Sequence, residues 1–178
     1  MFYRDIVDSP LGEITLASSG GRLSGLWFSG QKHFMAKLDP AAELQPDLPI
    51  FAETKKWLEA YFSGRNPGPI PPVILEGTPF QHRVWNLLGT IPYGETVTYG
   101  QMANRLAEES ASGKMSCRAV GGAVGHNPIS IILPCHRVVG ADGSLTGYAG
   151  GIKRKLFLLE LEGIDTTRFR IPTKGTAL

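Results

Sequence analysis

The chain opens with short runs of β-type residues separated by turn residues. Residues 2–7, 13–17 and 23–28 are rich in β-branched, aromatic and other apolar types. Clusters of Gly, Ser, Asp and Pro at 8–12 and 18–21 interrupt them. Strand-forming runs bounded by turn formers indicate consecutive strands. The pattern predicts a small antiparallel meander.

A helical period and a proline-rich stretch follow the meander. Apolar positions at three- and four-residue intervals predict a helix at about 50–62, and Gly64 marks its end. Residues 66–72 contain four prolines, which exclude a helix or a central strand. We expect a linker here, dividing the chain into domains 1–72 and 73–178.

Beyond the linker the pattern becomes helical. Thr78 followed by Pro79 is typical of a helix start, because Thr caps the first turn and Pro suits the first helical position. Two short helices are predicted at 99–106 and about 117–124. Their polar connection favours a helix-turn-helix.

The last elements complete the expected fold. Residues 128–139 are apolar and predict an extended segment, and a final helix is expected at about 152–162, closed by Gly163. The fold class is therefore α+β. We expect an N-terminal α/β domain with a small antiparallel sheet, and a mostly helical C-terminal domain with a helix-turn-helix.

Composition narrows the functional classes. The 178 residues are 42% hydrophobic and 19% charged, an ordinary globular mixture. No apolar run approaches the roughly 20 residues that span a bilayer. Two cysteines cannot form a secreted disulfide framework. We expect a cytoplasmic protein with no membrane partner, in which sulfur chemistry is thiol chemistry.

Charge is uneven along the chain. The net charge is +2, but residues 99–155 carry 7 basic and 3 acidic side chains, whereas residues 1–98 carry 8 and 10. The middle region is therefore where an anionic partner is expected. A solvated basic face is the alternative on charge alone.

The helix at 117–124 contains Gly121 and Gly122 side by side. Each glycine in a helix interior costs about 1 kcal/mol relative to alanine, so a close approach of the backbone to another surface is indicated. Both a DNA groove and a neighbouring helix satisfy that requirement.

Residues 134–137, Pro-Cys-His-Arg, are the candidate chemical motif. A cysteine beside histidine and basic residues can be activated as a thiolate nucleophile, although a buried structural cysteine gives the same local pattern. A zinc site would use Cys117, His126, Cys135 and His136, but their spacing matches none of the usual ligand patterns. The glycine-rich run 140–151 lacks a nucleotide-binding signature and is interpreted as a flexible pocket wall.

Three neighbouring strings together resemble one known family. They are residues 127–129 (Asn-Pro-Ile), 134–140 (Pro-Cys-His-Arg-Val-Val-Gly) and 147–151 (Gly-Tyr-Ala-Gly-Gly). The chain resembles the O6-alkylguanine-DNA alkyltransferases, the methylated-DNA–protein-cysteine methyltransferases, in their stand-alone bacterial form. The resemblance runs from about residue 80 to residue 163 and extends more loosely over the N-terminal meander.

The resemblance implies a mechanism of irreversible alkyl transfer. Cys135 would accept the alkyl group from O6-alkylguanine, and also from O4-alkylthymine, in duplex DNA. His136 would deprotonate the thiol through a water, and Glu162 would orient His136. A thioether is not hydrolysed, so each molecule would act once and need no cofactor.

The resemblance also implies that the damaged nucleotide is flipped out of the duplex. Arg118 would fill the vacated space, Tyr99 would promote the rotation, and the recognition helix would enter the minor groove. Further residues implied by the resemblance are Ala119 and Gly122 at the groove, and Asn127, Tyr148 and Ala149 at the pocket.

The sequence departs from the family pattern in several places. The connection from Leu106 to Arg118 is longer than in compact members, Cys117 replaces a small residue and is interpreted as structural, and Ala149 replaces a serine of some members. Residues 1–98 contain no cysteine, so no zinc site is expected. We expect a monomer. The competing hypotheses are a catalytically inactive alkyltransferase-like binding protein and a cysteine hydrolase.

Overall fold

The computed structural model describes residues 1–36, 38–110 and 113–172. The chain forms two compact units. The first unit comprises Met1–Glu76 together with Pro128–Ile132, and the second comprises Gly77–Asn127 and the chain from Leu133 onward. The first unit thus gains a short segment from far along the sequence. The domain limit expected at residue 72 stays a prediction.

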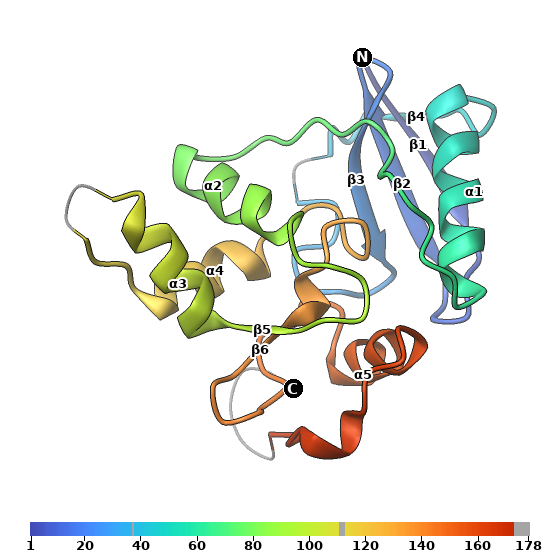
Figure 1. Cartoon of the computed structure of the whole chain (residues 1–178). Coiled ribbons are helices and arrows are strands. Elements are labelled where there is room, and N and C mark those ends of the chain that lie inside the picture. Colours follow the sequence, from blue (N-terminus) through green and yellow to red (C-terminus); the bar gives the residue numbers. More distant parts are fainter. Residues whose placement is uncertain (37, 111–112, 173–178) are drawn as a thin grey trace. The chain divides into compact units, whose positions relative to one another are not determined.

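The first unit is built on a four-stranded sheet with the order β3-β2-β1-β4 (Figure 1). β1 (Phe2–Val7), β2 (Ile14–Ser19) and β3 (Arg22–Phe28) are antiparallel, as the meander predicted. β4 (Glu43–Leu44) was not predicted. It runs parallel to β1, so the sheet is mixed rather than purely antiparallel. Two exposed residues carry no readable alternation, which explains why β4 was missed.

Helix α1 (Pro49–Phe62) and the segment 128–132 complete the first unit. α1 buries Phe51, Leu58 and Tyr61 and contacts β2 and β3. The segment 128–132 hydrogen-bonds to β3: Leu26 N donates to the carbonyl of Pro128, and the carbonyl of Leu26 accepts from Ser130 N. β3 is the end strand of the sheet, so this segment extends the sheet at its edge.

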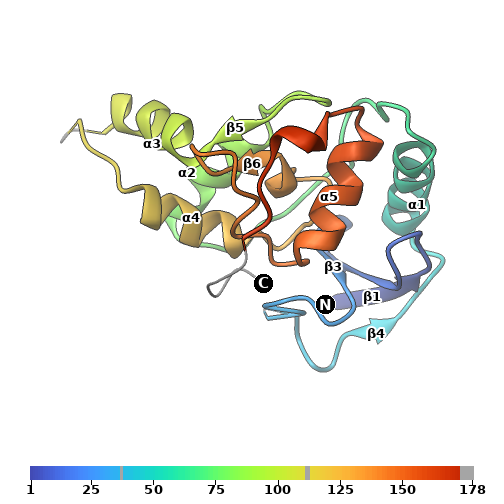
Figure 2. The same ribbon diagram turned by 90° about the horizontal axis from the view of Figure 1, so that it is seen from below.

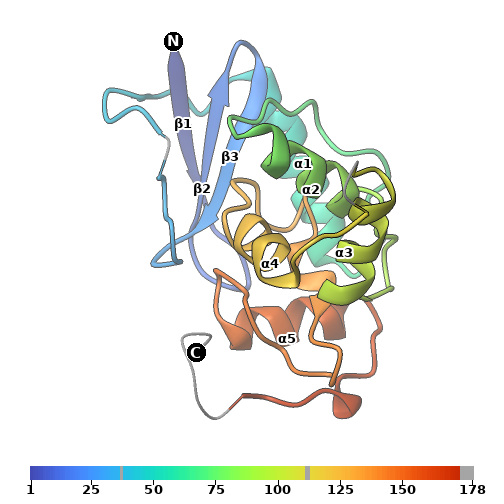
Figure 3. The same ribbon diagram turned by 90° about the vertical axis from the view of Figure 1, so that its left-hand side faces the viewer.

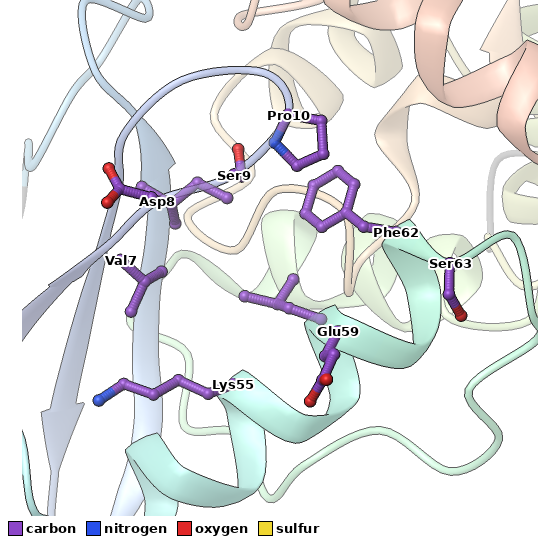
Figure 4. A pocket seen from close by; sticks show the side chains of 10 residues that line it. Val7, Asp8, Ser9, Pro10, Lys55, Glu59, Phe62 and Ser63 are labelled. Carbon is purple, nitrogen blue, oxygen red and sulfur yellow. The ribbon is translucent and has the colours of Figure 1, made fainter.

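A pocket of about 590 Å³ lies at one end of this sheet (Figure 4). Residues of the turn after β1, including Ser9 and Pro10, form one wall, and Lys55, Glu59 and Phe62 of α1 form the other. Every residue that lines it belongs to the first unit. None of them is a site residue expected from the sequence.

The second unit begins with the helices α2 (Pro79–Leu88), α3 (Tyr99–Glu108) and α4 (Cys117–Gly125). α4 packs against both α2 and α3 (Figures 2 and 3). The indole nitrogen of Trp85 in α2 donates to the carbonyl of Ala123 in α4 at 2.9 Å. The predicted helices, including the pair expected as a helix-turn-helix, are confirmed.

The chain that follows α4 is not the extended segment that the sequence predicted. Residues 127–139 are all buried, but they form turns, the short 3-10 helix η1 (Cys135–Arg137) and the two-residue strand β6 (Val138–Val139). Ile131 has a positive φ of 69°, which is strained for a β-branched residue. The apolar run therefore reflected burial rather than strand structure.

The remaining elements surround η1. β6 pairs in parallel with β5 (Val97–Thr98), and α5 (Ile152–Leu161) contacts η1. The 3-10 helix η2 (Thr166–Arg168) follows α5. Across the described residues, we find no helix with the length and apolar character that a bilayer crossing requires. The α+β fold class is confirmed.

The start of α3 provides a test of local stability. The Thr98 hydroxyl accepts a hydrogen bond from Gln101 N, and the side-chain oxygen of Gln101 accepts one from Thr98 N. We expect Thr98→Ala to lower the free energy of unfolding by about 1 kcal/mol, because one N-terminal amide loses its acceptor. Thr98→Ser retains the acceptor and should change stability much less, as measured by chemical denaturation.

Candidate active site

Cys135 lies at the start of η1 and is 5% exposed. The side-chain amide of Asn127 donates to its sulfur, with Nδ2 3.1 Å from Sγ. The same nitrogen donates to the carbonyl of Leu133 at 2.8 Å. Asn127 therefore fixes the short connection on which the thiol is carried.

Glu162 is the centre of a buried hydrogen-bond cluster. It follows α5 as the C-cap residue. Its Oε1 lies 2.6 Å from His136 Nε2, and Arg137 donates from Nε to Oε2 at 2.8 Å and from Nη2 to Oε1 at 3.0 Å. The backbone amide of Gly94 also donates to Oε2 at 3.1 Å. Gly94 has a φ of +79°, a backbone conformation that favours glycine.

These contacts determine the charge of Glu162. Burial alone would raise the pKa of its carboxyl, but the hydrogen bonds from His136 and Arg137, together with the charge of Arg137, outweigh burial and hold the pKa at about 2. Glu162 is thus ionised at neutral pH and accepts hydrogen bonds only.

The ionised carboxylate in turn defines the state of His136. Burial lowers the pKa of the imidazole, and the opposing attraction of Glu162 does not restore it. A neutral imidazole that donates from Nε2 to Glu162 carries no proton on Nδ1. His136 therefore has a nitrogen that can accept a proton.

Cys135 itself is in an environment that disfavours its charged form. Burial raises the pKa of the thiol, while the hydrogen bond from Asn127 and the charge of Lys155 oppose that rise. A base is therefore needed to generate the thiolate, which is the nucleophilic form of cysteine.

Two tyrosines lie near this cluster. The ring of Tyr148 is perpendicular to that of His136, with centroids 6.4 Å apart. Its hydroxyl is buried and has no hydrogen-bond partner among the described residues. Tyr99 is half-buried, and its hydroxyl donates to the carbonyl of Thr146 at 3.0 Å. The Tyr148 hydroxyl is thus available to a ligand that enters the site.

Glycines allow both tyrosines to approach the backbone closely. A Cβ on Gly147 would lie 2.6 Å from the Tyr99 hydroxyl oxygen, and a Cβ on Gly150 would lie 2.5 Å from the Tyr148 ring. Ala149 lies between Tyr148 and Gly150 and is half-buried. The run 147–151 is thus shaped around the tyrosines, consistent with a pocket wall.

Three of the residues expected at DNA lie on α4. Arg118, Ala119 and Gly122 are exposed on α4, whereas its Val120, Ala123 and Val124 are buried. The structure thus brings Cys135, His136, Glu162, Asn127 and Tyr148 into one cluster, and leaves the three α4 residues open to solvent. Cys117 is exposed at the first turn of α4, which contradicts its interpretation as a structural, packed cysteine.

Sequence reasoning missed two members of the cluster. Arg137 belongs to the recognised motif but received no role, and Lys155 was placed on a helix with no role at all. The side chain of Lys155 is fully buried. The signal that could have found it is the spacing of Lys155 from the buried positions Ile152, Leu158 and Leu159, because residues three and four apart share one face of a helix.

The described residues contain no cluster of three or more His, Cys, Asp or Glu side chains that could hold a metal ion. The geometry instead defines a class of protein with one buried free cysteine, a hydrogen-bonded histidine–carboxylate pair that begins at the next residue, and a helix-turn-helix whose second helix has an exposed face.

Comparisons with known proteins identify the family. Residues 79–164 match the family described as "6-O-methylguanine DNA methyltransferase, DNA binding domain", and residues 2–69 match "6-O-methylguanine DNA methyltransferase, ribonuclease-like domain". The chain belongs to the 6-O-methylguanine DNA methyltransferase family, as the sequence motifs indicated.

Individual relatives agree with this assignment. The chain is 46% identical over 162 residues to the methylated-DNA–protein-cysteine methyltransferase of Mycobacterium tuberculosis, covering 91% of this chain and 93% of the relative. It is 45% identical over 161 residues to that of Methanosarcina acetivorans, covering 90% and 98%. The crystal structure of Mycobacterium tuberculosis OGT in complex with DNA matches with a TM-score of 0.79 and 43% identity, covering 94% of each chain.

The charge of Glu162 yields a prediction for stability. Because its pKa is about 2 when folded and 4.5 ordinarily, the unfolded chain binds more protons between these values, and the stabilisation is lost as pH falls through that window. We expect Glu162→Gln to lower the free energy of unfolding at pH 7 by about 3 kcal/mol and to remove this acid dependence. Denaturation curves from pH 2.5 to pH 7 would measure both effects.

Glu160 provides the matched control for that experiment. It is an exposed residue of the same helix, and it accepts one hydrogen bond from Thr166. Glu160→Gln should leave the stability and its acid dependence close to those of the parent protein. An equal effect of the two substitutions would contradict the role given to the buried cluster.

Proposed function

We propose that this protein repairs alkylated DNA by direct reversal, transferring the alkyl group of O6-alkylguanine, and of O4-alkylthymine, irreversibly to Cys135. The observation that carries the proposal is the buried thiol, held by Asn127 and accompanied by a neutral histidine that an ionised carboxylate orients. The family membership of the chain supports the same chemistry.

The residues of the cluster divide the chemical work. His136 accepts the thiol proton through a water, and Glu162 stabilises the imidazolium that forms. The sulfur then attacks the alkyl carbon, and the bond from that carbon to O6 breaks. Its electron pair stays on the guanine, which takes up one proton. The product is a thioether, so the protein acts once.

The reaction requires the damaged nucleotide to leave the duplex. Arg118, exposed on α4, is suited to fill the space in the stack, and Tyr99 to promote the rotation. Tyr148, whose buried hydroxyl has no protein partner among the described residues, is suited to donate to the guanine oxygen as it leaves. Asn127 and Ala149 complete the pocket, Asn127 by fixing the thiol's connection.

We infer that double-stranded DNA binds through its minor groove. Ala119 and Gly122 leave the exposed face of α4 without bulky side chains, and no atom lies within 4 Å of a Cβ placed on Gly122. Such a face fits a groove whose edges carry little sequence information. The solved relative in complex with DNA supports a DNA partner.

The remaining proposals concern organisation. Residues 1–72 form the N-terminal α/β domain and residues 73–178 the DNA-binding and acceptor domain. The protein acts as a monomer, without a cofactor. Both cysteines are free thiols, which supports a location in the cytoplasm, where thiols are kept reduced.

Mass spectrometry tests the central claim. Incubation with a duplex containing O6-methylguanine should add the mass of one methylene to each chain, on the Cys135 peptide, with no turnover beyond stoichiometry. Cys135→Ala should abolish transfer and retain DNA binding, which would distinguish the acceptor from a lesion-binding residue. Cys117→Ala should transfer normally. Multiple turnover would indicate a cysteine hydrolase instead, and a methyl group on Cys117 would contradict the assignment.

Binding measurements test the DNA-facing helix. We expect Arg118→Ala to weaken binding to lesion-containing duplex by about tenfold, because the vacated position in the stack loses its occupant. Arg65, exposed in the first unit, gives the control Arg65→Ala, whose affinity should match the parent. Equal losses for both variants would indicate a non-specific charge effect.

A further inference from the structure

Lys155 is a fully buried lysine in the middle of α5. Its ammonium donates to the carbonyl of Val138 at 2.5 Å and to that of Thr146 at 3.1 Å. Among the described residues, no carboxylate forms an ion pair with it. Lysine is almost never fully buried unless it is paired with an opposite charge. The two carbonyls are neutral, so they do not balance the positive charge of Lys155.

The buried cluster around it carries an excess of positive charge. Arg137 is positive and Glu162 negative, and the two bind each other in a bidentate pair. His136 is neutral. Lys155 therefore adds one positive charge that no buried anion balances while the sulfur of Cys135 is protonated.

Loss of the thiol proton would balance that charge. Val138, whose carbonyl accepts from Lys155, follows Cys135 by three residues, and α5 contacts η1 directly. We propose that the Lys155 ammonium is the counter-ion of the Cys135 thiolate, and that alkyl transfer removes the anion and leaves Lys155 as an uncompensated buried cation. This inference rests on the function proposed above. Lys155 is a positioning residue, since it acts through Cys135.

The titration behaviour of both groups agrees with this pairing. Burial lowers the pKa of Lys155 to about 8, and the charge of Cys135 opposes that effect. The Lys155 charge in turn lowers the pKa of Cys135 and that of His136. Tyr99 of α3 is a further titratable group near the ammonium, because its hydroxyl shares the Thr146 carbonyl with it.

The chemical step changes the charge of one member of the pair only. The thiol proton leaves through His136 and water before the reaction, so that a thiolate faces the ammonium. The sulfur then forms a bond to the alkyl carbon, the carbon–O6 bond breaks, and the guanine keeps the electron pair and takes a proton from water. The thioether is neutral. Lys155 can then relieve its buried charge only by releasing a proton to solvent.

The first test follows Lys155 in the parent fold. Nuclear magnetic resonance of protein labelled at the lysine Cε carbons, recorded from pH 6 to pH 11, should show Lys155 titrating near pH 8 and at a distinctly lower pH after methylation of Cys135. The methyl donor is O6-methylguanine duplex in one sample and methyl iodide in another, using Cys117→Ala protein to leave one reactive thiol. A Lys155 pKa that methylation does not move would overturn the inference.

The two methyl donors separate the inference from the proposed function. If the duplex transfers no methyl group, the repair function is wrong, while the methyl iodide sample still reports on charge coupling. If the duplex transfers its methyl group and the Lys155 pKa stays constant, only the counter-ion role is wrong.

The second test uses rates of transfer. We expect Lys155→Met to slow single-turnover transfer at pH 7 by about tenfold or more, because an opposite charge at close range shifts a pKa by about 1–3 units, and to move the pH–rate profile to higher pH. Lys153 is exposed on the same helix, and Lys153→Met should retain the parent profile. Lys155→Arg keeps the charge and should retain more activity than Lys155→Met.

A merely structural role would give a different result. If Lys155 only stabilised the fold, the Lys155→Met variant would transfer more slowly in proportion to its loss of folded protein. The pH–rate profile of the remaining folded fraction would not move. That outcome would contradict the counter-ion role. The resonance measurement requires no substitution at Lys155, so it decides the question even if Lys155→Met does not fold.

Discussion

The second unit depends on keeping one buried carboxylate ionised. Glu162 has four hydrogen-bond donors directed at its two oxygens, from His136, Arg137 and the Gly94 amide. Burying a charge is costly unless it is paired and hydrogen-bonded. Because these donors meet that requirement, the carboxylate can fix the orientation and tautomer of the histidine. The orientation and tautomer of the His136 imidazole thus follow from the hydrogen bonds that Glu162 accepts, although Glu162 lies 26 positions further along the chain.

Local structure brings these distant residues together. Glu162 lies at the end of α5, and the left-handed backbone of Gly94 directs an amide to it. The 3-10 turn of η1 carries the three consecutive residues Cys135, His136 and Arg137. A regular strand at 135–137 would alternate its side chains between opposite faces. In the tight turn of η1, by contrast, Cys135, His136 and Arg137 are all buried.

The sequence predicted those helices and strands whose formation is determined by neighbouring residues. The Thr-capped starts of α2 and α3, the turn-bounded strands and the family motif were all recognisable from neighbouring residues. The conformation of residues 128–139 was not, because hydrophobicity reports burial and this segment is buried without being a strand. Arg137 and Lys155 were missed for a related reason. Their surroundings are built by residues far along the chain, and only the folded structure shows that these charges are enclosed.

The carbonyl of Thr146 accepts hydrogen bonds from both the Tyr99 hydroxyl and the Lys155 ammonium. A phenol has a single proton to donate, so Tyr99 must release Thr146 before it can donate a hydrogen bond to another acceptor. If Tyr99 donates to the flipped base as the proposed function requires, entry of the nucleotide exchanges one acceptor of this proton for another. Lys155 also donates to the Thr146 carbonyl, so this oxygen would keep a donor after such an exchange. On the proposed function, a base without a suitable acceptor would gain nothing from displacing the bond between Tyr99 and Thr146.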